Sequence, residues 1–296
     1  MTTELAIIDI GSNSVRYAEE HEGRLPRKEV FTTRLGEGLF RLGRLGEEPM
    51  RRSIDLIRGL ASRAESSGRA PFAYATSAVR DAANGREFAS MVETASGVPV
   101  RILSGAEEAR FAFLAAAKKG ETLIDIGGAS MQLVTENEAV SFPAGAVRCG
   151  EIARSLSGAQ NCDDIFPAQR AALRRYLEET VEFPEKPSAL VGVGGTITTL
   201  AALLLGLREY SPSAVEGFCL KAEEARRLEA QLEEAGDEKR RSHPLLARRH
   251  DIILYGAEIL LFAMERLGAD SLRVSEADGM EGYLAVLKGA YAEYNA

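Results

Sequence analysis

Cysteine is scarce in this sequence of 296 residues, and its three copies lie far apart at Cys149, Cys162 and Cys219. They form no C-x-x-C pair. An odd, scattered set of cysteines is typical of a reduced chain in the cytosol, where the small thiols serve as packing residues. We therefore expect a cytoplasmic protein.

Long hydrophobic runs are also missing. LAALLLGL stops after eight residues, and the apolar stretch from Ile252 is interrupted by Glu258. Both are shorter than the roughly 20 residues that a membrane-spanning helix needs. The N-terminus, MTTELAIIDIGSN, has neither the basic start nor the apolar stretch of a signal peptide. We expect no membrane as a partner.

An excess of basic residues is absent as well, since 36 Lys and Arg stand against 44 Asp and Glu. The net charge of −8 gives no long-range attraction for nucleic acid, so none is expected as a partner, and any polyanion must meet a local basic patch. Arg34, Arg41 and Arg44 in TRLGEGLFRLGRLG (33–46) offer such a patch, with simple solubility as the alternative.

Common catalytic signatures are lacking too. The three histidines, His21, His243 and His250, share no metal-ligand spacing, so no zinc site is expected. Neither G-x-S-x-G nor a Walker lysine turn is present. The composition itself, with 45% hydrophobic and 27% charged residues, is that of a globular chain that can bury a substantial core.

Short β-rich runs alternate with longer helical patterns, which predicts an α/β fold. The expected strands cover residues 5–10, 72–75, 98–103, 122–126, 131–135, 189–193 and 272–275. Apolar residues spaced three or four apart predict helices over 49–66 and 106–118. A third helix, over 221–241, is charged nearly throughout, and we expect its charges to face solvent.

The second half of the chain begins much as the first does. Ile8-Asp9-Ile10-Gly11-x-x-Ser14 matches Ile124-Asp125-Ile126-Gly127-x-x-Ser130 at five of seven positions. Each copy is an apolar strand that runs into a turn of small residues at the head of its half. The match predicts two similar α/β halves, with a boundary at the polar KKGE of 118–121.

Both copies place an aspartate beside a glycine turn. Such turns leave backbone N–H groups open to phosphate oxygens. Asp9 or Asp125 is then a candidate to hold hydrated Mg²⁺ and to orient a water molecule. A third glycine turn, Gly194-Gly195-Thr196, leads into an apolar helix, whose start attracts anions, with Thr196 as a candidate N-cap. Plain tight connections are the alternative for all three.

The segment from Ser104 begins a helix in which Ser104 and Glu107 have the S-x-x-E spacing of a capping box. Glu108 lies one step round the helix and is free of that role. It is either a surface charge or a carboxylate that takes a proton from an attacking water. Arg80 is either half of a surface ion pair with Asp81 or a clamp for phosphate.

Six strings of the sequence together resemble the exopolyphosphatase / guanosine pentaphosphate phosphohydrolase family. They run in order from about residue 5 to residue 288: IDIGSNSVR, YATSAVRDAANG, ILSGAEEAR, LIDIGGAS, VGVGGTITTLAAL and LRVSEADGMEGYL. The resemblance implies two related actin-like (ribonuclease H-like) domains with an interdomain cleft. We place them at residues 1–118 and 119–296, with the last helix as a candidate to pack back on the first domain.

The resemblance also assigns roles to residues. It implies Glu108 as the base that activates water, with Asp125 and Arg80 as further catalytic groups. Asp9, Asp125 and, more weakly, Gln132 would hold Mg²⁺. The phosphate-binding residues would be those of the three turns, Gly11, Ser12, Asn13, Ser14, Gly127, Gly128, Ala129, Ser130, Gly194, Gly195 and Thr196.

Two stretches depart from the family pattern. Where the family reads D-I-G-G-G-S-T-E, this chain has Ala129 and Gln132. Gln132 adds no negative charge for a cation, and the methyl group of Ala129 resists positive φ and narrows the turn. Glu216 replaces a family histidine and adds charge unfavourable to a polyanion. These changes put metal affinity and turnover, but not the fold, in question.

The sequence thus predicts Mg²⁺-dependent hydrolysis of terminal phosphoanhydride bonds, which would release phosphate from polyphosphate or convert guanosine pentaphosphate to tetraphosphate. The first alternative is a weakly active or inactive sensor of guanosine tetra- or pentaphosphate or of polyphosphate. The second is an actin-like ATPase or sugar kinase, which gives no role to the E-E-A and T-S-A-V-R strings. A homodimer is left open.

Overall fold

The computed structural model describes residues 4–157, 166–183, 187 and 189–289, so that Cys162 lies outside the described residues. The chain divides into two compact units. Unit 1 contains the described residues up to Phe111 and those from Gly279 onward, and unit 2 contains Ala112–Asp278. The division falls within helix α5 (Gly105–Ala116).

Unit 1 is built on a five-stranded sheet in the order β3-β2-β1-β4-β5. Its central strand β1 pairs antiparallel with β2 and parallel with β4, and all six β1 residues are buried. Such a fully buried strand reads as a continuous apolar run, as LAIIDI does. The strands are β1 (Leu5–Ile10), β2 (Ser14–Glu19), β3 (Lys28–Thr32), β4 (Ala70–Ala75) and β5 (Val100–Ile102).

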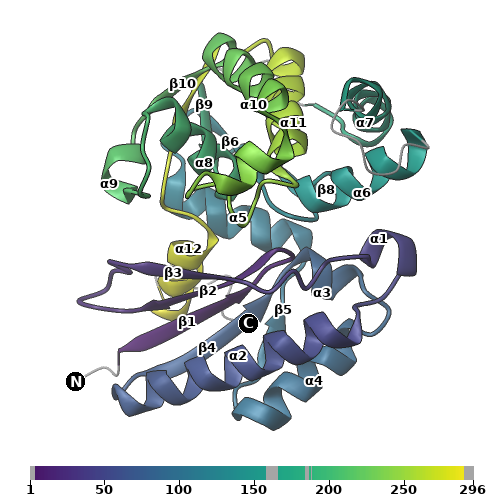
Figure 1. Cartoon of the computed structure of the whole chain (residues 1–296). Helices are drawn as coiled ribbons and strands as arrows, with labels where there is room; N and C mark the ends of the chain where they lie inside the picture. Colours follow the sequence, from purple (N-terminus) through teal and green to yellow (C-terminus); the bar gives the residue numbers. More distant parts are fainter. Residues whose placement is uncertain (1–3, 158–165, 184–186, 188, 290–296) are drawn as a thin grey trace. The chain divides into compact units, whose positions relative to one another are not determined.

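Helices cover both faces of this sheet (Figure 1). Neighbouring residues of a strand point to opposite faces, so Ile8 packs in the core that contains Ile57 and Phe88, whereas Ile7 packs with Phe111 and Tyr283. Unit 1 thereby includes the last helix. Its helices, besides the start of α5, are α1 (Leu39–Leu42), α2 (Glu47–Ser66), α3 (Ser77–Asp81), α4 (Gly85–Ser96) and α12 (Gly279–Leu287).

Unit 2 is built on a six-stranded sheet in the order β10-β11-β9-β6-β7-β8. Here β6 pairs antiparallel with β7 and parallel with β9, as β1 does with β2 and β4. The order β8-β7-β6-β9-β11 in this sheet corresponds to β3-β2-β1-β4-β5 in unit 1. Strand β10 has no counterpart in the sheet of unit 1. The strands are β6 (Glu121–Ile126), β7 (Met131–Val134), β8 (Ala139–Phe142), β9 (Ala189–Val193), β10 (Cys219–Lys221) and β11 (Ser271–Val274).

The repeated strand order confirms the prediction of two related α/β halves. The core of unit 2 centres on α11, of which thirteen residues are buried. Its helices, besides the end of α5, are α6 (Ala146–Ser157), α7 (Phe166–Thr180), α8 (Gly195–Leu204), α9 (Pro212–Val215), α10 (Ala222–Ser242) and α11 (Ile253–Leu267). Within the described ranges, no helix combines the length and the apolar character needed to cross a bilayer.

Helix α10 corrects one expectation. The charges of this segment do not all face solvent, because Glu229 and Arg240 are buried. Arg240 donates to the carbonyl oxygens of Leu232, at 2.8 Å, and His250, at 3.2 Å. The helix is kinked at Gly236, where φ is 74°. The guanidinium thus satisfies the carbonyl group of Leu232 beside the kink and links the helix to the segment at His250.

Candidate functional site

The turn between β1 and β2 is closed by one backbone hydrogen bond, from the N–H of Gly11 to the oxygen of Ser14 at 3.1 Å. A Cβ atom on Gly11 would lie 2.9 Å from that oxygen, so the turn requires glycine. Among the described residues, no backbone hydrogen bond uses the N–H groups of Ser12 and Asn13. These groups are available to an anion.

The turn between β6 and β7 has the same geometry. The N–H of Gly127 donates to the oxygen of Ser130 at 3.0 Å, and no backbone hydrogen bond in the described part of the chain uses the N–H of Gly128, Ala129 or Ser130. The internal sequence match therefore corresponds to a structural repeat. The expectation that the methyl group of Ala129 opposes the backbone conformation of this turn is wrong, because Ala129 does not have a positive φ.

Gly145 lies against this second turn, although the sequence analysis did not single it out. A Cβ atom at Gly145 would overlap the backbone nitrogens of Ala129 and Ser130. The missing side chain lets the chain pass beside the turn while its N–H groups stay uncovered. The signal in the sequence was weak, a single glycine between Pro143 and the start of α6.

The third turn joins β9 to α8. The N-cap of α8 is Gly194, with φ 90° and no side-chain cap, so the prediction of Thr196 as N-cap is wrong. Thr196 lies inside the helix and packs against Gly256 of α11. A Cβ atom at Gly194 would overlap Oδ1 of Asp125, which brings the second and third predicted turns together in unit 2.

Arg249 is a residue of this region that sequence reasoning missed. Its guanidinium lies so close to Gly195 that a Cβ atom there would be 2.7 Å from Cζ. A cation is thereby placed at the start of α8, where helix N–H groups also favour an anion. No local pattern predicts this, because the contact joins residues 54 positions apart in the sequence.

In unit 1, Asp9 is only 3% exposed and is held by Arg16, its cross-strand partner on β2. Nε of Arg16 donates to Oδ2 of Asp9 at 2.7 Å. Beside this pair, the hydroxyl groups of Ser12 and Ser77 lie 3.3 Å apart, which joins the first turn to α3. The structure thus brings the predicted residues of the first turn next to the helix that carries Arg80.

Arg80 binds Glu108 rather than Asp81 alone. Its Nη1 donates to Oε2 of Glu108 at 2.9 Å and to the oxygen of Leu103 at 3.0 Å, whereas Nε is 3.5 Å from Asp81. Burial raises the pKa of Glu108 to about 7, against the lowering effect of Arg80, and the Asp9 and Asp81 charges raise it further. A carboxyl group with this pKa exchanges a proton near neutral pH.

Glu107 has the structural role that its spacing predicts. Ser104 N–H donates to its Oε2 at 2.8 Å and Glu107 N–H donates to Oγ of Ser104 at 3.2 Å, which confirms the capping box. Arg101 also binds Oε1 of Glu107 at 2.7 Å. Glu107 is therefore fully engaged, and Glu108 is the carboxylate of this pair that is left for chemistry.

Two of the three residues that depart from the family pattern, Gln132 and Glu216, form hydrogen bonds that support a turn or the backbone. Nε2 of Gln132 donates to Oγ of Ser130 at 2.8 Å and to Oγ of Ser141 at 3.1 Å. Glu216 accepts a hydrogen bond from the N–H of Glu276 at 2.7 Å. Across the described residues, no group of three or more His, Cys, Asp or Glu side chains is close enough to hold a metal by itself.

Comparison with known proteins agrees with these features. Residues 18–287 match the family model described as "Ppx/GppA phosphatase family". The chain is 28% identical to "Exopolyphosphatase 2" of Mycobacterium tuberculosis, over 97% of this chain and 99% of that protein. Among solved structures, an Aquifex aeolicus member of the Ppx/GppA family superposes with a TM-score of 0.76 at 30% identity, over 98% and 99% of the two chains. An "exopolyphosphatase-like protein" superposes with a TM-score of 0.83 at 26% identity, over 97% and 99%.

Proposed function

The chain belongs to the Ppx/GppA phosphatase family, and on that basis we propose that it hydrolyses the terminal phosphoanhydride bond of inorganic polyphosphate. The observation that carries the proposal is the pair of Arg80 and Glu108 in unit 1. It supplies a largely buried carboxyl group with a pKa of about 7 in the same unit as a turn with available N–H groups.

Glu108 is the general base of the proposed reaction. Its carboxylate accepts a proton from water as the oxygen of that water attacks the terminal phosphorus, and the bond from phosphorus to the bridging oxygen breaks. The shortened chain leaves with the bridging oxygen. Arg80 fixes one oxygen of Glu108, so that the other is directed to the water.

The glycine turns bind phosphate oxygens. In unit 1 the N–H groups of Ser12 and Asn13 are the proposed donors to phosphate. Within unit 2 the proposed donors are the N–H groups of Gly128, Ala129 and Ser130, and the start of α8 with Gly194, Gly195 and Thr196 adds the positive end of a helix. Fixed N–H groups of this kind need little reorganisation as charge moves from the terminal phosphate to the leaving oxygen.

Mg²⁺ is the proposed cofactor. It usually takes one or two carboxylates together with phosphates and water, so isolated aspartates beside phosphate turns fit it without a cluster of three protein ligands. Asp9 or Asp125, each beside the glycine turn of its own unit, would hold it. Gln132, whose amide nitrogen supports Ser130, contributes at most an oxygen. The ion supplies charge neutralisation on the phosphates.

The test is release of inorganic phosphate from long-chain polyphosphate, with and without Mg²⁺, by the wild type and by Glu108→Gln. We expect metal-dependent release that falls by about a hundredfold or more in the variant, as loss of a general base does. Glu107→Gln is the matched control, because it changes the neighbouring carboxylate, and should retain turnover.

Two other outcomes would change the proposal. If the folded wild type releases no more phosphate than Glu108→Gln, the proposal is wrong, and binding of guanosine tetraphosphate or polyphosphate without turnover would favour the sensor. Release from guanosine pentaphosphate but not from polyphosphate would retain the chemistry and change the substrate.

A further inference from the structure

Residues 33–46, between β3 and α2, form a segment that we call the arginine loop (Figure 1). The proposed function assigns no role to it. β2 and β3 form an antiparallel hairpin in which Ser14 pairs with Thr32, so the chain leaves β3 beside the first phosphate turn. The N–H of Arg34 donates to the oxygen of Asn13 at 2.9 Å, and that of Gly36 donates to the oxygen of Ser12 at 2.7 Å. One end of the loop is therefore bonded to the turn.

The other end is bonded to the segment that follows α3, the helix of Arg80. The oxygen of Gly43 accepts a hydrogen bond from the N–H of Ala83 at 3.0 Å. Oδ1 of the buried Asn84 accepts one from the N–H of Leu45 at 2.8 Å, and its Nδ2 donates to the oxygen of Leu45 at 3.1 Å. The arginine loop thus connects the two segments that carry the proposed catalytic and phosphate-binding residues of unit 1.

The loop has a defined conformation. Leu35, Leu39 and Leu45 are buried in the core beneath it. Arg34 has a φ of 51°, which costs a residue with a side chain of the order of 1 kcal/mol and persists where the surroundings impose it. Such strain is often found where a loop binds a ligand. The exposed side chains are therefore presented from a fixed backbone.

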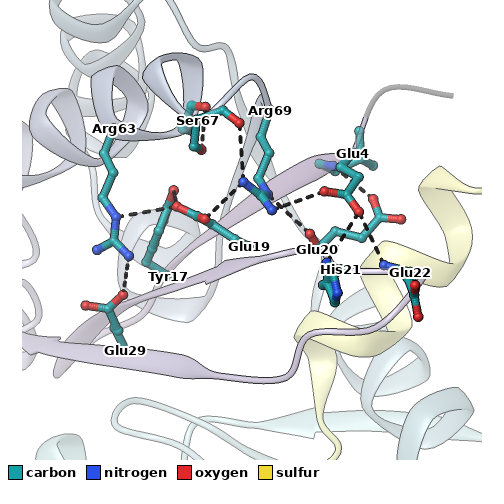
Figure 2. A network of polar contacts seen from close by, with 12 residues as sticks. Glu4, Tyr17, Glu19, Glu20, His21, Glu22, Glu29, Arg63, Ser67 and Arg69 are labelled. Atoms are coloured by element: carbon teal, nitrogen blue, oxygen red, sulfur yellow. Dashed lines mark hydrogen bonds and ion pairs between the residues drawn. The ribbon is translucent and has the colours of Figure 1, made fainter. Parts of the chain in front are cut away.

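Those exposed side chains include two unpaired cations. Arg41 and Arg44 are exposed, and no carboxylate of the described residues forms an ion pair with either. Toward the opposite end of the hairpin, by contrast, Arg63 and Arg69 are paired, with Arg63 Nη2 at 2.6 Å from Glu29 and Arg69 Nη2 at 3.1 Å from Glu4 (Figure 2). Arg41 and Arg44 thus carry positive charge, without a paired carboxylate in the described part of the chain, on a loop that is bonded to the first phosphate turn.

We propose that Arg41 and Arg44 bind the extended part of a polyphosphate chain whose terminal phosphate occupies the first turn. Guanidinium groups match phosphate geometry with paired N–H donors. A chain of identical anionic units needs no fixed register, so two cations on a short loop can hold successive phosphates. The inference rests on the proposed function, and it assigns the preference for long over short chains to this loop.

The test compares kcat/KM for long-chain polyphosphate and for tripolyphosphate in the wild type and in the double variant Arg41→Ala/Arg44→Ala. Each exposed ion contact of this kind changes affinity by about two- to fivefold. The ratio of kcat/KM for long-chain polyphosphate to kcat/KM for tripolyphosphate should therefore fall by roughly tenfold in the double variant. The effect should shrink at high salt, because salt screens exposed charges. Neither arginine has a packing role, so the variant should fold.

The matched control is Arg24→Ala/Arg27→Ala, which removes the same charge from exposed positions of unit 1. These arginines lie at the other end of β2 and β3, about 16 Å of strand away from the turn. The control should keep the wild-type ratio. A ratio that falls equally in both variants reflects net charge alone and overturns the inference, as does an unchanged ratio in Arg41→Ala/Arg44→Ala.

Equilibrium binding of the same two polyphosphates separates this inference from the proposed function. One outcome is that the wild type releases no phosphate and still binds long-chain polyphosphate. In that case, weaker binding by Arg41→Ala/Arg44→Ala supports the proposed role of the arginine loop in binding, although the proposed hydrolysis is wrong. Equal binding by the wild type and the variant overturns that role, whether or not hydrolysis is observed. A loss seen only with guanosine pentaphosphate also overturns it, since the loop would then recognise a nucleotide.

Discussion

Nη1 of Arg80 lies 2.9 Å from Oε2 of Glu108 and, at 3.0 Å, also donates to the carbonyl oxygen of Leu103. The second contact fixes the guanidinium to the end of β5, so the arginine positions the carboxylate rather than following it. Burial raises the pKa of Glu108 and the arginine limits that rise. One side chain therefore orients the proposed base and also moderates the rise in its pKa that burial causes.

The first prediction concerns pH. A base must be ionised to accept a proton, and the pKa of Glu108 is about 7, so kcat/KM for polyphosphate should rise tenfold per pH unit below pH 7 and level off above it. The measurement is a pH profile of phosphate release at saturating Mg²⁺. An acidic limb near pH 4.5, the ordinary value for glutamate, would contradict the assignment.

Removal of the guanidinium should move that limb. In Arg80→Ala the lowering effect on the pKa of Glu108 is lost, so its pKa rises and the acidic limb shifts to higher pH, together with a lower plateau because the carboxylate is less well positioned. Arg101→Ala is the control, since it breaks the similar contact to Glu107 at 2.7 Å and should leave the limb in place. A lower plateau without any shift would mean that Arg80 acts only on substrate.

Much of the fold was predictable because its central strands are continuous apolar runs. The expected strands over 5–10 and 189–193 match β1 and β9, and the helix over 49–66 lies within α2. The strands that were missed, β2, β3, β8 and β10, follow β1 in the hairpins or lie at sheet edges. Their sequences, such as SVRYAE and KEVFT, mix charged and apolar residues without clear alternation.

The site was predictable where its signals are local. The turns around Gly11 and Gly127 and the capping box at Glu107 follow from spacing alone. Gly145 and Arg249 were missed because each acts on a turn distant in sequence, through close packing that no pattern in a single sequence records. Thr196 was misassigned as an N-cap because Gly194 has a positive φ, which begins the helix earlier.

Gly145→Ala should damage the second turn. The added methyl group would overlap the backbone nitrogens of Ala129 and Ser130, so we expect a loss of about 1–3 kcal/mol in the free energy of unfolding and a higher KM for polyphosphate. Denaturant titration and steady-state kinetics measure the two effects. Gly59→Ala, in the exposed middle of α2 with nothing within 4 Å, should instead stabilise by about 0.5–1 kcal/mol. Equal stability of both variants would rule out the steric argument.

A buried group in unit 2 should make stability depend on pH. Glu229 and Glu258 are buried together, and Arg170 lies 3.5 Å from Glu229 and 3.0 Å from Glu258. Burial raises the pKa of Glu229, and the Glu258 charge raises it further. The folded state therefore binds this proton more tightly than the unfolded chain. Its contribution is complete below the ordinary glutamate pKa and is lost as the pH rises through the raised value.

Glu229→Gln tests this by keeping the neutral form at every pH. The free energy of unfolding of the wild type, relative to the variant, should decline from pH 5 to pH 9, by about 1.4 kcal/mol for each unit of pKa shift. Urea titrations at several pH values provide the measurement. Glu234→Gln, at an exposed position of α10, should run parallel to the wild type. A constant difference between wild type and Glu229→Gln would mean that Glu229 is ionised when folded.

Unit 1 is formed from two separate segments of the chain, and this affects the order in which the two units can fold during synthesis. Helix α12 packs Tyr283 against Tyr74 and Phe111, with ring centroids 4.7 Å and 5.8 Å apart, and a Cβ atom on Gly282 would overlap the backbone of Phe111. During synthesis the ribosome releases all of unit 2 before α12. Unit 2 can therefore finish folding first, while the sheet that carries Asp9 has one apolar face only partly covered, by Phe111 and its neighbours, until α12 emerges.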